Sequence, residues 1–276
     1  MKSRVWTLCL AAALGLGFGS TASAVTGCTN DWLNGAFAVQ FSGTGAAASG
    51  RLIGGIAIPK DTATAGALLP VTGVMRLTLT PEGALSGYSW GNLQGGWVQD
   101  ATLTGSFSVN TDCTASFNLT DASGATAQFS GVIVGQGDSV LVTQTDSGSG
   151  ITGQMKRVRG FCQTSDLAGS FGMQYTGSVL GSSGGSTSST GMITLDGNGG
   201  VAATEARFNG SKYAQTTSTG SINVNPDCSF SLSLMAADGS SVNFVGLVAA
   251  GSQQAPAPLL VRSDAGTAVS GSMIAQ

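Results

Sequence analysis

The chain contains the same sequence pattern twice, and this duplication limits the folds that are open to it. Four blocks of the first half recur in the same order in the second half. They pair residues 28–43 with 162–177, 77–83 with 193–199, 104–113 with 219–228, and 129–131 with 244–246. Self-similarity of this kind indicates two copies of one structural unit. We therefore predict two similar domains, over residues 25–157 and 158–276.

The first copy is longer than the second. The offset between matching blocks falls from 134 residues at the first pair to 116 at the second. About 18 extra residues therefore lie between residues 44 and 72 of the first copy. This insert contains Pro59, Lys60 and Pro70, and it predicts a long loop or an added hairpin.

Within each copy, apolar and polar residues alternate with a period of two. Between residues 102 and 109, Leu103, Phe107 and Val109 fall on one side of the chain, and Ser and Thr fall on the other. Such alternation is typical of a strand with one buried face and one face in water. Turn residues follow every 8 to 12 residues, and about eight strands can be counted in each copy. We predict an all-β fold of two tandem antiparallel β-barrels.

Four cysteines follow the N-terminal segment, two in each copy and at matching places. They are Cys28 and Cys113 in the first copy, and Cys162 and Cys228 in the second. Four cysteines permit three pairings. Only Cys28 with Cys113 and Cys162 with Cys228 keeps each copy self-contained, so we predict one disulfide in each barrel.

The first 24 residues have the layout of a secretory signal peptide. Lys2 and Arg4 precede an apolar run over residues 5–18, and a small-residue cleavage site ends at Ala24. Export would place the cysteines in an oxidising compartment. We expect a secreted or periplasmic protein with no transmembrane segment after cleavage. Lipid anchoring at Cys28, through a loose lipobox, is the less favoured alternative.

The charge of the exported chain argues against nucleic acid and anionic membranes as partners. Removal of the first 24 residues leaves 9 basic and 14 acidic residues, a net charge of −5. Such a balance provides no electrostatic footprint for a polyanion. Residues 156–159 form the one basic cluster, which falls at the domain junction and is typical of a solvated linker.

The chain has no histidine, and this removes the commonest general base and the commonest metal ligand. A Ser–Lys pair would need Lys60, Lys156 or Lys212, which fall in loop-like or junction segments. Most acidic residues fall in turns, where aspartate bonds its own backbone. The Asp-Gly-Asn-Gly run at residues 196–199 has too few carboxylates for calcium and predicts a hairpin turn. We expect no catalytic residue, no metal and no cofactor.

Three aromatic residues in the first copy stand out. Tyr88 and Trp90 are two residues apart and share one face of a strand, and Trp97 follows them. The second copy has nothing equivalent at residues 203–206. A buried core or a barrel closure is the ordinary explanation. Small-molecule pockets also use aromatic walls with few polar groups, and so the three residues are our candidates for a ligand site.

The motifs of the two copies resemble a repeat of uncharacterised function in secreted bacterial proteins. They are Leu-x-Gly-x-Phe beside a cysteine, Asp-Gly-Asn-Gly, and the run that ends Val-Asn-Pro-Asp-Cys. The resemblance implies small barrels similar to the calycin (lipocalin-like) and allene-oxide-cyclase-like superfamilies. Phe37 and Phe171 replace the tryptophan of the calycin Gly-x-Trp signature. These motifs are turn and disulfide residues, which speak for fold rather than activity.

Three functions remain open at this point. The first is an exported, non-enzymatic double barrel that binds an apolar small molecule. The second is a structural or adhesive protein that contacts a cell-surface component, and the third is a barrel-type isomerase or cyclase. Room inside a barrel would separate the first and third from the second. A buried carboxylate in that room would favour the third.

Overall fold

The computed structural model describes residues 27–46, 52–53, 56–57, 68–93, 96–180, 184–210, 212–251 and 255–276. The predicted signal peptide over residues 1–24 lies outside these ranges. The described chain consists of strands, turns and short 3-10 helices. The helices are η1 (Asn30–Leu33), η2 (Gly135–Gly137) and η3 (Thr164–Leu167).

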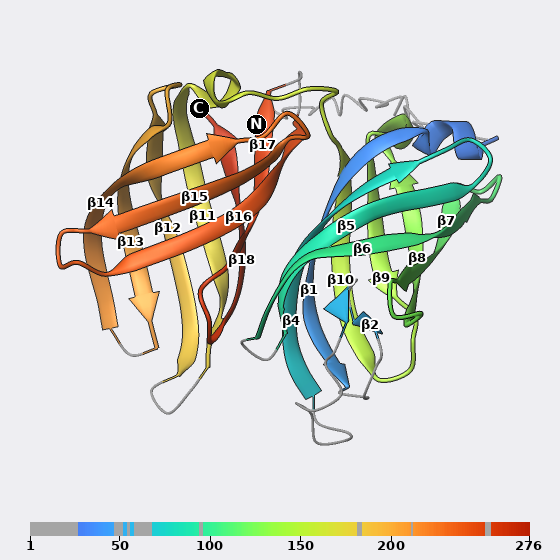
Figure 1. The fold of residues 1–276 in the computed structure, drawn as a ribbon, viewed down its shortest axis with the longest axis horizontal. Coiled ribbons are helices and arrows are strands. Elements are labelled where there is room, and N and C mark those ends of the chain that lie inside the picture. Colours follow the sequence, from blue (N-terminus) through green and yellow to red (C-terminus); the bar gives the residue numbers. More distant parts are fainter. Residues whose placement is uncertain are drawn as a thin grey trace, which may run out of the picture.

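The first copy forms a closed barrel of eight antiparallel strands (Figure 1). Its strands are β1 (Gly35–Ala46), β4 (Leu68–Leu79), β5 (Ala84–Leu93), β6 (Gly96–Val109), β7 (Thr114–Asp121), β8 (Thr126–Val134), β9 (Ser139–Gln144) and β10 (Ser149–Arg157). Strand β1 closes the ring because it pairs with both β4 and β10. A separate two-stranded sheet, β2 (Leu52–Ile53) with β3 (Ile56–Ala57), lies within the predicted insert.

The second copy forms a second closed barrel with the same order of strands. They are β11 (Gly169–Val179), β12 (Gly185–Leu195), β13 (Gly200–Asn209), β14 (Lys212–Val224), β15 (Ser229–Ala236), β16 (Ser241–Ala250), β17 (Pro256–Arg262) and β18 (Thr267–Ala275). Each strand pairs with the next, and β11 pairs with β18 to close the ring. The predicted fold class of two tandem antiparallel barrels is confirmed.

Side chains alternate between the inside and the outside of each barrel, as the period of two predicts. Leu103, Phe107 and Phe117 are buried in the core of the first barrel, whereas Thr104 and Ser116 are exposed. The second barrel has its own buried cluster. Burial of a large apolar side chain contributes about 1.5–3 kcal/mol, so these interiors provide most of the stability of each barrel.

A 3-10 helix covers the same end of each barrel, which we call the upper end (Figure 1). Leu33 of η1 and Leu167 of η3 are both fully buried against the core of their own barrel. The lower end is the opposite one, where β11 joins β12, β13 joins β14, and β17 joins β18. The connection between β11 and β12 spans only residues 180–184, whereas residues 47–67 connect β1 to β4.

The predicted disulfides are present. Cys28 and Cys113 are bonded with their Cα atoms 5.1 Å apart, and Cys162 and Cys228 with theirs 4.9 Å apart. Each bond ties the segment before the 3-10 helix to the turn that ends Asp-Cys. In both turns the cysteine has a left-handed backbone, with φ of 66° at Cys113 and 70° at Cys228.

The basic cluster at the junction is not a solvated linker. Arg157 ends β10 and donates hydrogen bonds to the carbonyl oxygens of Trp32 at 2.5 Å and Asn34 at 2.9 Å. Its guanidinium lies 5.0 Å from the centroid of the Phe37 ring. Arg157 therefore holds η1 on the first barrel, a role that appears only when both ends of the copy are brought together.

Loss of either disulfide should lower stability without changing the fold. Each bond closes a long loop, of 85 and 66 residues, so replacing one pair of cysteines with serine should cost about 4 kcal/mol in the chain-entropy model. Urea unfolding of C28S/C113S and C162S/C228S measures this cost. A variant that unfolds at the same urea concentration as the parent would contradict the prediction.

Candidate functional site

The three predicted aromatic residues lie on the outer face of the first barrel and contact the second barrel. Trp90 on β5 is 8% exposed and belongs to a cluster that both barrels share. Tyr88 and Trp97 are partly buried and pack against this cluster. The Tyr88 and Trp90 rings meet edge to face, with centroids 4.7 Å apart. Tyr88, Trp90 and Trp97 thus contribute to the contact between the two barrels. Their predicted role in binding a ligand remains a prediction.

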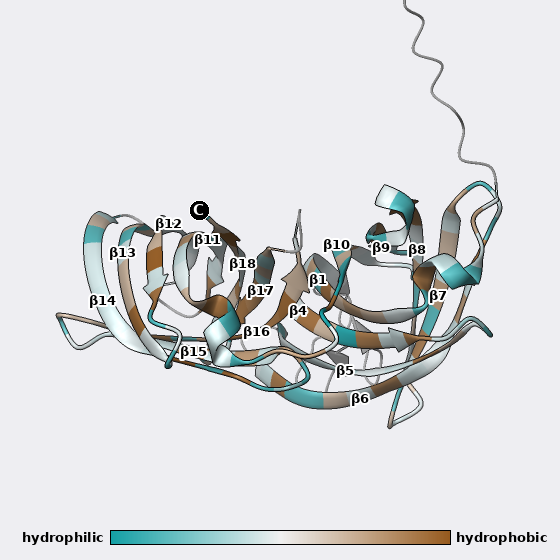
Figure 2. Ribbon diagram, turned by 90° about the horizontal axis from the view of Figure 1, so that it is seen from above, coloured by the Kyte–Doolittle hydropathy of each residue, from teal (hydrophilic) through white to brown (hydrophobic). Residues whose placement is uncertain are grey.

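The second barrel contributes the other half of this interface. Its outward-facing apolar residues on β16 and β17 are buried. They are Leu247, Ala249, Leu259 and Val261. These strands run alongside β1, β4 and β5 of the first barrel (Figures 1 and 2). In the second barrel the positions that match Tyr88 and Trp90 are Thr204 and Ala206, and Thr204 is exposed. The outer face of β5 contacts the other barrel, and this face carries the aromatic residues. The matching face of β13 in the second barrel lacks them.

Side chains of the first barrel also bond the backbone of the second. The Gln40 amide donates to the carbonyl oxygens of Leu260 at 3.0 Å and Gly271 at 2.6 Å, two residues that face each other across β17 and β18. The Asn92 amide donates to the carbonyl oxygen of Arg262 at 2.6 Å. Buried amides that find carbonyl partners specify one relative orientation of the two barrels.

Tyr88 and Arg76 bind the disulfide turn of the second barrel. The Tyr88 hydroxyl donates to the carboxylate of Asp227, and Arg76 Nε donates to the Asp227 carbonyl oxygen at 2.9 Å. Burial, followed by the hydrogen bond to Asp227 and its charge, raises the pKa of Tyr88. Burial opposes ionisation of Asp227, but hydrogen bonds from Tyr88 and Ser229 and the charge of Arg76 outweigh it and lower the Asp227 pKa.

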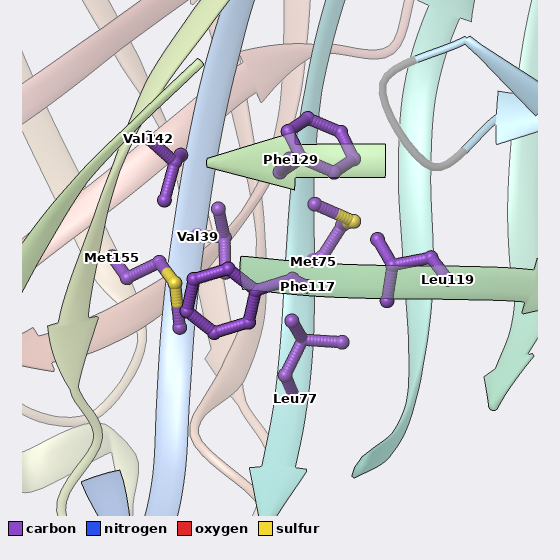
Figure 3. A pocket seen from close by; sticks show the side chains of 8 residues that line it. All are labelled: Val39, Met75, Leu77, Phe117, Leu119, Phe129, Val142 and Met155. Atoms are coloured by element: carbon purple, nitrogen blue, oxygen red, sulfur yellow. The ribbon is translucent and has the colours of Figure 1, made fainter. Parts of the chain in front are cut away.

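The first barrel is filled by its own side chains. Its core contains a cavity of about 10 Å³, which eight apolar side chains line (Figure 3). They are Val39, Met75, Leu77, Phe117, Leu119, Phe129, Val142 and Met155. A cavity of this size has room for about one water molecule, whereas small-molecule pockets measure about 300–1,000 Å³. This cavity is too small for an apolar ligand.

The second barrel is polar inside, toward its lower end. Glu205 on β13 is 1% exposed, and its carboxylate accepts hydrogen bonds from the Tyr175 hydroxyl at 2.9 Å and the Ser189 hydroxyl at 2.7 Å. Arg207 forms an ion pair with the same carboxylate at 3.3 Å. Ser218 on β14 is 4% exposed and lies on the same inner face, opposite Ala203 and two positions along the ladder from Glu205. We call these five residues the Glu205 cluster.

The first barrel shows the same positions without such a cluster. The strand registers match, since Phe41 pairs with Gly73 as Tyr175 pairs with Ser189. The corresponding positions are Phe41 and Tyr175, Gly73 and Ser189, Ser89 and Glu205, Gly91 and Arg207, and Leu103 and Ser218. A Cβ atom at Gly73 would overlap the Phe41 ring. In the first barrel the Phe41 ring occupies the space beside Gly73. In the second barrel the matching pair, Tyr175 and Ser189, carries two hydroxyl groups.

The carboxylate of Glu205 is held by other members of its cluster. The two oxygens of Glu205 already accept from a phenol, a hydroxyl and a guanidinium. Burial, followed by the charge of Glu205, raises the pKa of Tyr175 and keeps its hydroxyl a neutral donor. The carboxylate of Glu205 therefore serves as the common hydrogen-bond acceptor that holds Tyr175, Ser189 and Arg207 together.

The residues that the structure describes include neither a cluster suited to a metal ion nor a membrane-spanning helix. Among the described residues, no three His, Cys, Asp or Glu side chains gather where they could hold a metal ion. Asp196 uses its carboxylate to accept from the amides of Asn198 and Gly200, as a hairpin turn requires. None of the described residues forms a helix long and apolar enough to cross a membrane.

The fold and the interface define a tandem double β-barrel with one disulfide in each barrel. No family model matches the chain, and no curated protein matches it. A solved structure described as intact Ap-TbpB (N and C lobes) is similar over 90% of this chain and 76% of that chain, at 10% identity and a TM-score of 0.28. That likeness is too remote to carry weight, and the resemblance to calycin or allene-oxide-cyclase-like barrels is not confirmed.

One feature of the sequence pointed to the Glu205 cluster. It was missed because most acidic residues of this chain fall in turns. Most acidic residues do fall in turns, but Glu205 and Arg207 fall inside a strand and continue the inner-facing series of Val201 and Ala203. Two charged residues on the buried face of a strand are expected only where they pair with each other or bind something.

Replacing Trp90 with alanine should destabilise the intact protein by about 3–5 kcal/mol, because it leaves a cavity in a buried apolar cluster. Urea unfolding, followed by the loss of β-sheet circular dichroism, measures the change. The matched control is Tyr213→Ala, since Tyr213 is 68% exposed. A Trp90→Ala variant as stable as this control would mean that the interface does not form in solution.

The bond between Tyr88 and Asp227 should give the interface a defined pH range. The lowered pKa of Asp227 means that its contribution is complete above its ordinary value of 3.8 and is lost as the pH falls through the lowered value. The raised pKa of Tyr88 means that its contribution is complete below 10.0 and is lost at higher pH. Tyr88→Phe should cost about 1–3 kcal/mol at neutral pH.

The measurement is urea unfolding of the parent and of Tyr88→Phe at about pH 3, 7 and 11. We expect the difference between the two proteins to be largest at neutral pH and to shrink at both extremes. Asp227→Asn keeps one neutral acceptor oxygen and removes the titrating carboxylate. The difference between Asp227→Asn and its Tyr88→Phe double variant should therefore not change between pH 3 and pH 7. A constant difference between the parent and Tyr88→Phe at all three pH values would contradict the assignment.

Proposed function

We propose that the protein is an exported, non-enzymatic binding protein whose second barrel takes a small polar molecule at the Glu205 cluster. The first barrel serves as the scaffold that positions the second. Export rests on the signal-like residues 1–24 and on the two disulfides, which suit an oxidising compartment. The similarity of each barrel to calycins belongs to this proposal, since small eight-stranded barrels hold one small ligand inside.

The observation that carries the proposal is the difference between the two interiors. The first barrel closes the same ring of strands around Phe41, Gly73, Ser89 and Leu103. The fold therefore does not need a buried ion pair. A buried polar group costs about 1–3 kcal/mol when it lacks a partner, and a buried charge costs more. The presence of the whole Glu205 cluster in one barrel supports a role other than stability.

The other functions fit these features less well. An apolar ligand in the first barrel meets a cavity of about 10 Å³. A barrel isomerase would use a buried carboxylate, which Glu205 provides, but its oxygens are held by Tyr175, Ser189 and Arg207. A purely structural role at the cell surface accounts for the Ser- and Thr-rich outer faces. It does not account for the Glu205 cluster inside the second barrel.

Native mass spectrometry of the protein, purified from its own host, tests the proposal. We expect a retained molecule that survives gentle desolvation and is lost on acid unfolding. Ser218→Leu, which installs the residue of the first barrel, should abolish retention. The control is Thr217→Val on the exposed outer face of the same strand. A parent protein without any bound molecule, or one whose Ser218→Leu variant keeps it, would defeat the proposal.

A further inference from the structure

We infer that the molecule held at the Glu205 cluster is uncharged and presents an oxygen that accepts hydrogen bonds. This inference rests on the proposed function and adds the chemical class of the ligand. It follows from two properties of the cluster. These are the polar atoms that lack partners and the balance of charge around them.

The first property is a pair of buried atoms with unused hydrogen-bonding capacity. Ser218 Oγ and Arg207 Nε are buried, and neither has a hydrogen-bond partner among the described residues. Both project from the inner faces of neighbouring strands, β14 and β13. Ser218 is 4% exposed, so its hydroxyl faces the interior rather than the solvent. An unpartnered buried donor carries an energetic cost that a ligand oxygen removes.

These two atoms specify the group that would satisfy them. The Nε atom of arginine can only donate, so its partner must be an acceptor. A serine hydroxyl can donate to an oxygen of the ligand or accept from a hydroxyl or amide of the ligand. Carbonyl, amide, ether and hydroxyl oxygens all meet this requirement, and so do the oxygens of an anion. Hydrogen bonding alone does not choose between neutral and anionic ligands.

The second property, the balance of charge, makes that choice. Glu205 is paired with Arg207 at 3.3 Å, and Arg262 is paired with Asp264 at 2.6 Å near the lower end of the same barrel. Arg207 also lowers the pKa of Asp238 slightly, but Asp238 is fully exposed to water. The positive and negative charges of these two buried or partly buried pairs are therefore equal before any ligand enters.

An ionic ligand would disturb this balance. Its charge would have to leave water and would find each nearby guanidinium and carboxylate already paired, and desolvation of an unpaired ion costs several kcal/mol. A neutral molecule avoids this cost and still gains the hydrogen bonds from Arg207 and Ser218. The two ion pairs then act as fixed dipoles that orient the oxygen of the ligand.

Three probes of one shape and different charge test the inference. They are benzamide, benzoate and benzylamine, the last as its ammonium ion at neutral pH. Isothermal titration calorimetry with the full-length protein gives the three dissociation constants. We expect benzamide to bind at least about tenfold more tightly than either ion, with little change between low and high salt.

Two variants assign the binding to the named atoms. Arg207→Lys keeps the charge that pairs with Glu205 and removes the Nε donor, and Ser218→Ala removes the hydroxyl. Each should weaken benzamide binding by about threefold to tenfold, the ordinary effect of one hydrogen bond. Thr217→Val serves again as the outer-face control and should leave the constant unchanged.

The outcomes separate this inference from the function on which it rests. Tighter binding of benzoate or benzylamine than of benzamide, or a charged molecule retained from the host, overturns the neutral class and leaves the binding site intact. Failure of all three probes together with an empty protein from the host overturns the proposed function itself. A neutral molecule retained from the host supports the inference even where benzamide proves too bulky.

Discussion

A closed barrel has an inside that its own side chains must fill, and the rest of this structure depends on how each copy meets that requirement. Closure satisfies the backbone hydrogen bonds of every strand and leaves no exposed sheet edge. The interior then holds the apolar residues of alternate positions. The first barrel fills the space with large side chains such as Phe41, Met75 and Leu103, which are all at most 2% exposed. The second barrel has Tyr175, Gly191 and Ser218 at the matching positions. Its interior also holds the hydrogen-bonded ion pair of Glu205 and Arg207.

Once both interiors are closed, only the outer faces remain for contact between the copies. Most outer positions carry Ser or Thr, which water solvates well. Apolar outer residues are of two kinds. Some, such as Val132 and Leu141, stay exposed to water. Others, including Trp90 and Val74 on the first barrel and Leu259 and Val261 on the second, meet in one buried cluster. The faces used are different on the two copies, so the contact is not symmetric. A duplicated barrel can therefore change its outer face without loss of its core, because the two sets of residues alternate along each strand.

The duplication, the disulfides and the barrel class could be predicted because each depends on local pattern or on simple pairing. The place of Tyr88, Trp90 and Trp97 could not. A period of two shows that Tyr88 and Trp90 share a face but not which face lies inside, and aromatic residues suit a core, a pocket wall and an interface equally well. The Glu205 cluster escaped notice for another reason. Its members come from four neighbouring strands, β11 to β14, so the cluster exists only after these strands pair in register. The period of two places Glu205 and Arg207 on one face of β13 but does not show that this face lies inside.

The turn that carries each second cysteine shows how one local motif acquires a second use. Asp112 and Asp227 occupy the same position, and each accepts a hydrogen bond from the backbone amide two residues ahead. In the first barrel the motif stops there, and Asp112 is fully exposed with a pKa lowered by its bonds to Thr114. In the second barrel the same carboxylate also accepts from Tyr88 of the other copy. Since Cys228 follows at once and is bonded to Cys162, the interface includes a turn that the disulfide ties to the segment before η3. The same turn joins β14 to β15, so the hydrogen bond from Tyr88 reaches the end of the strand that carries Ser218 on its inner face.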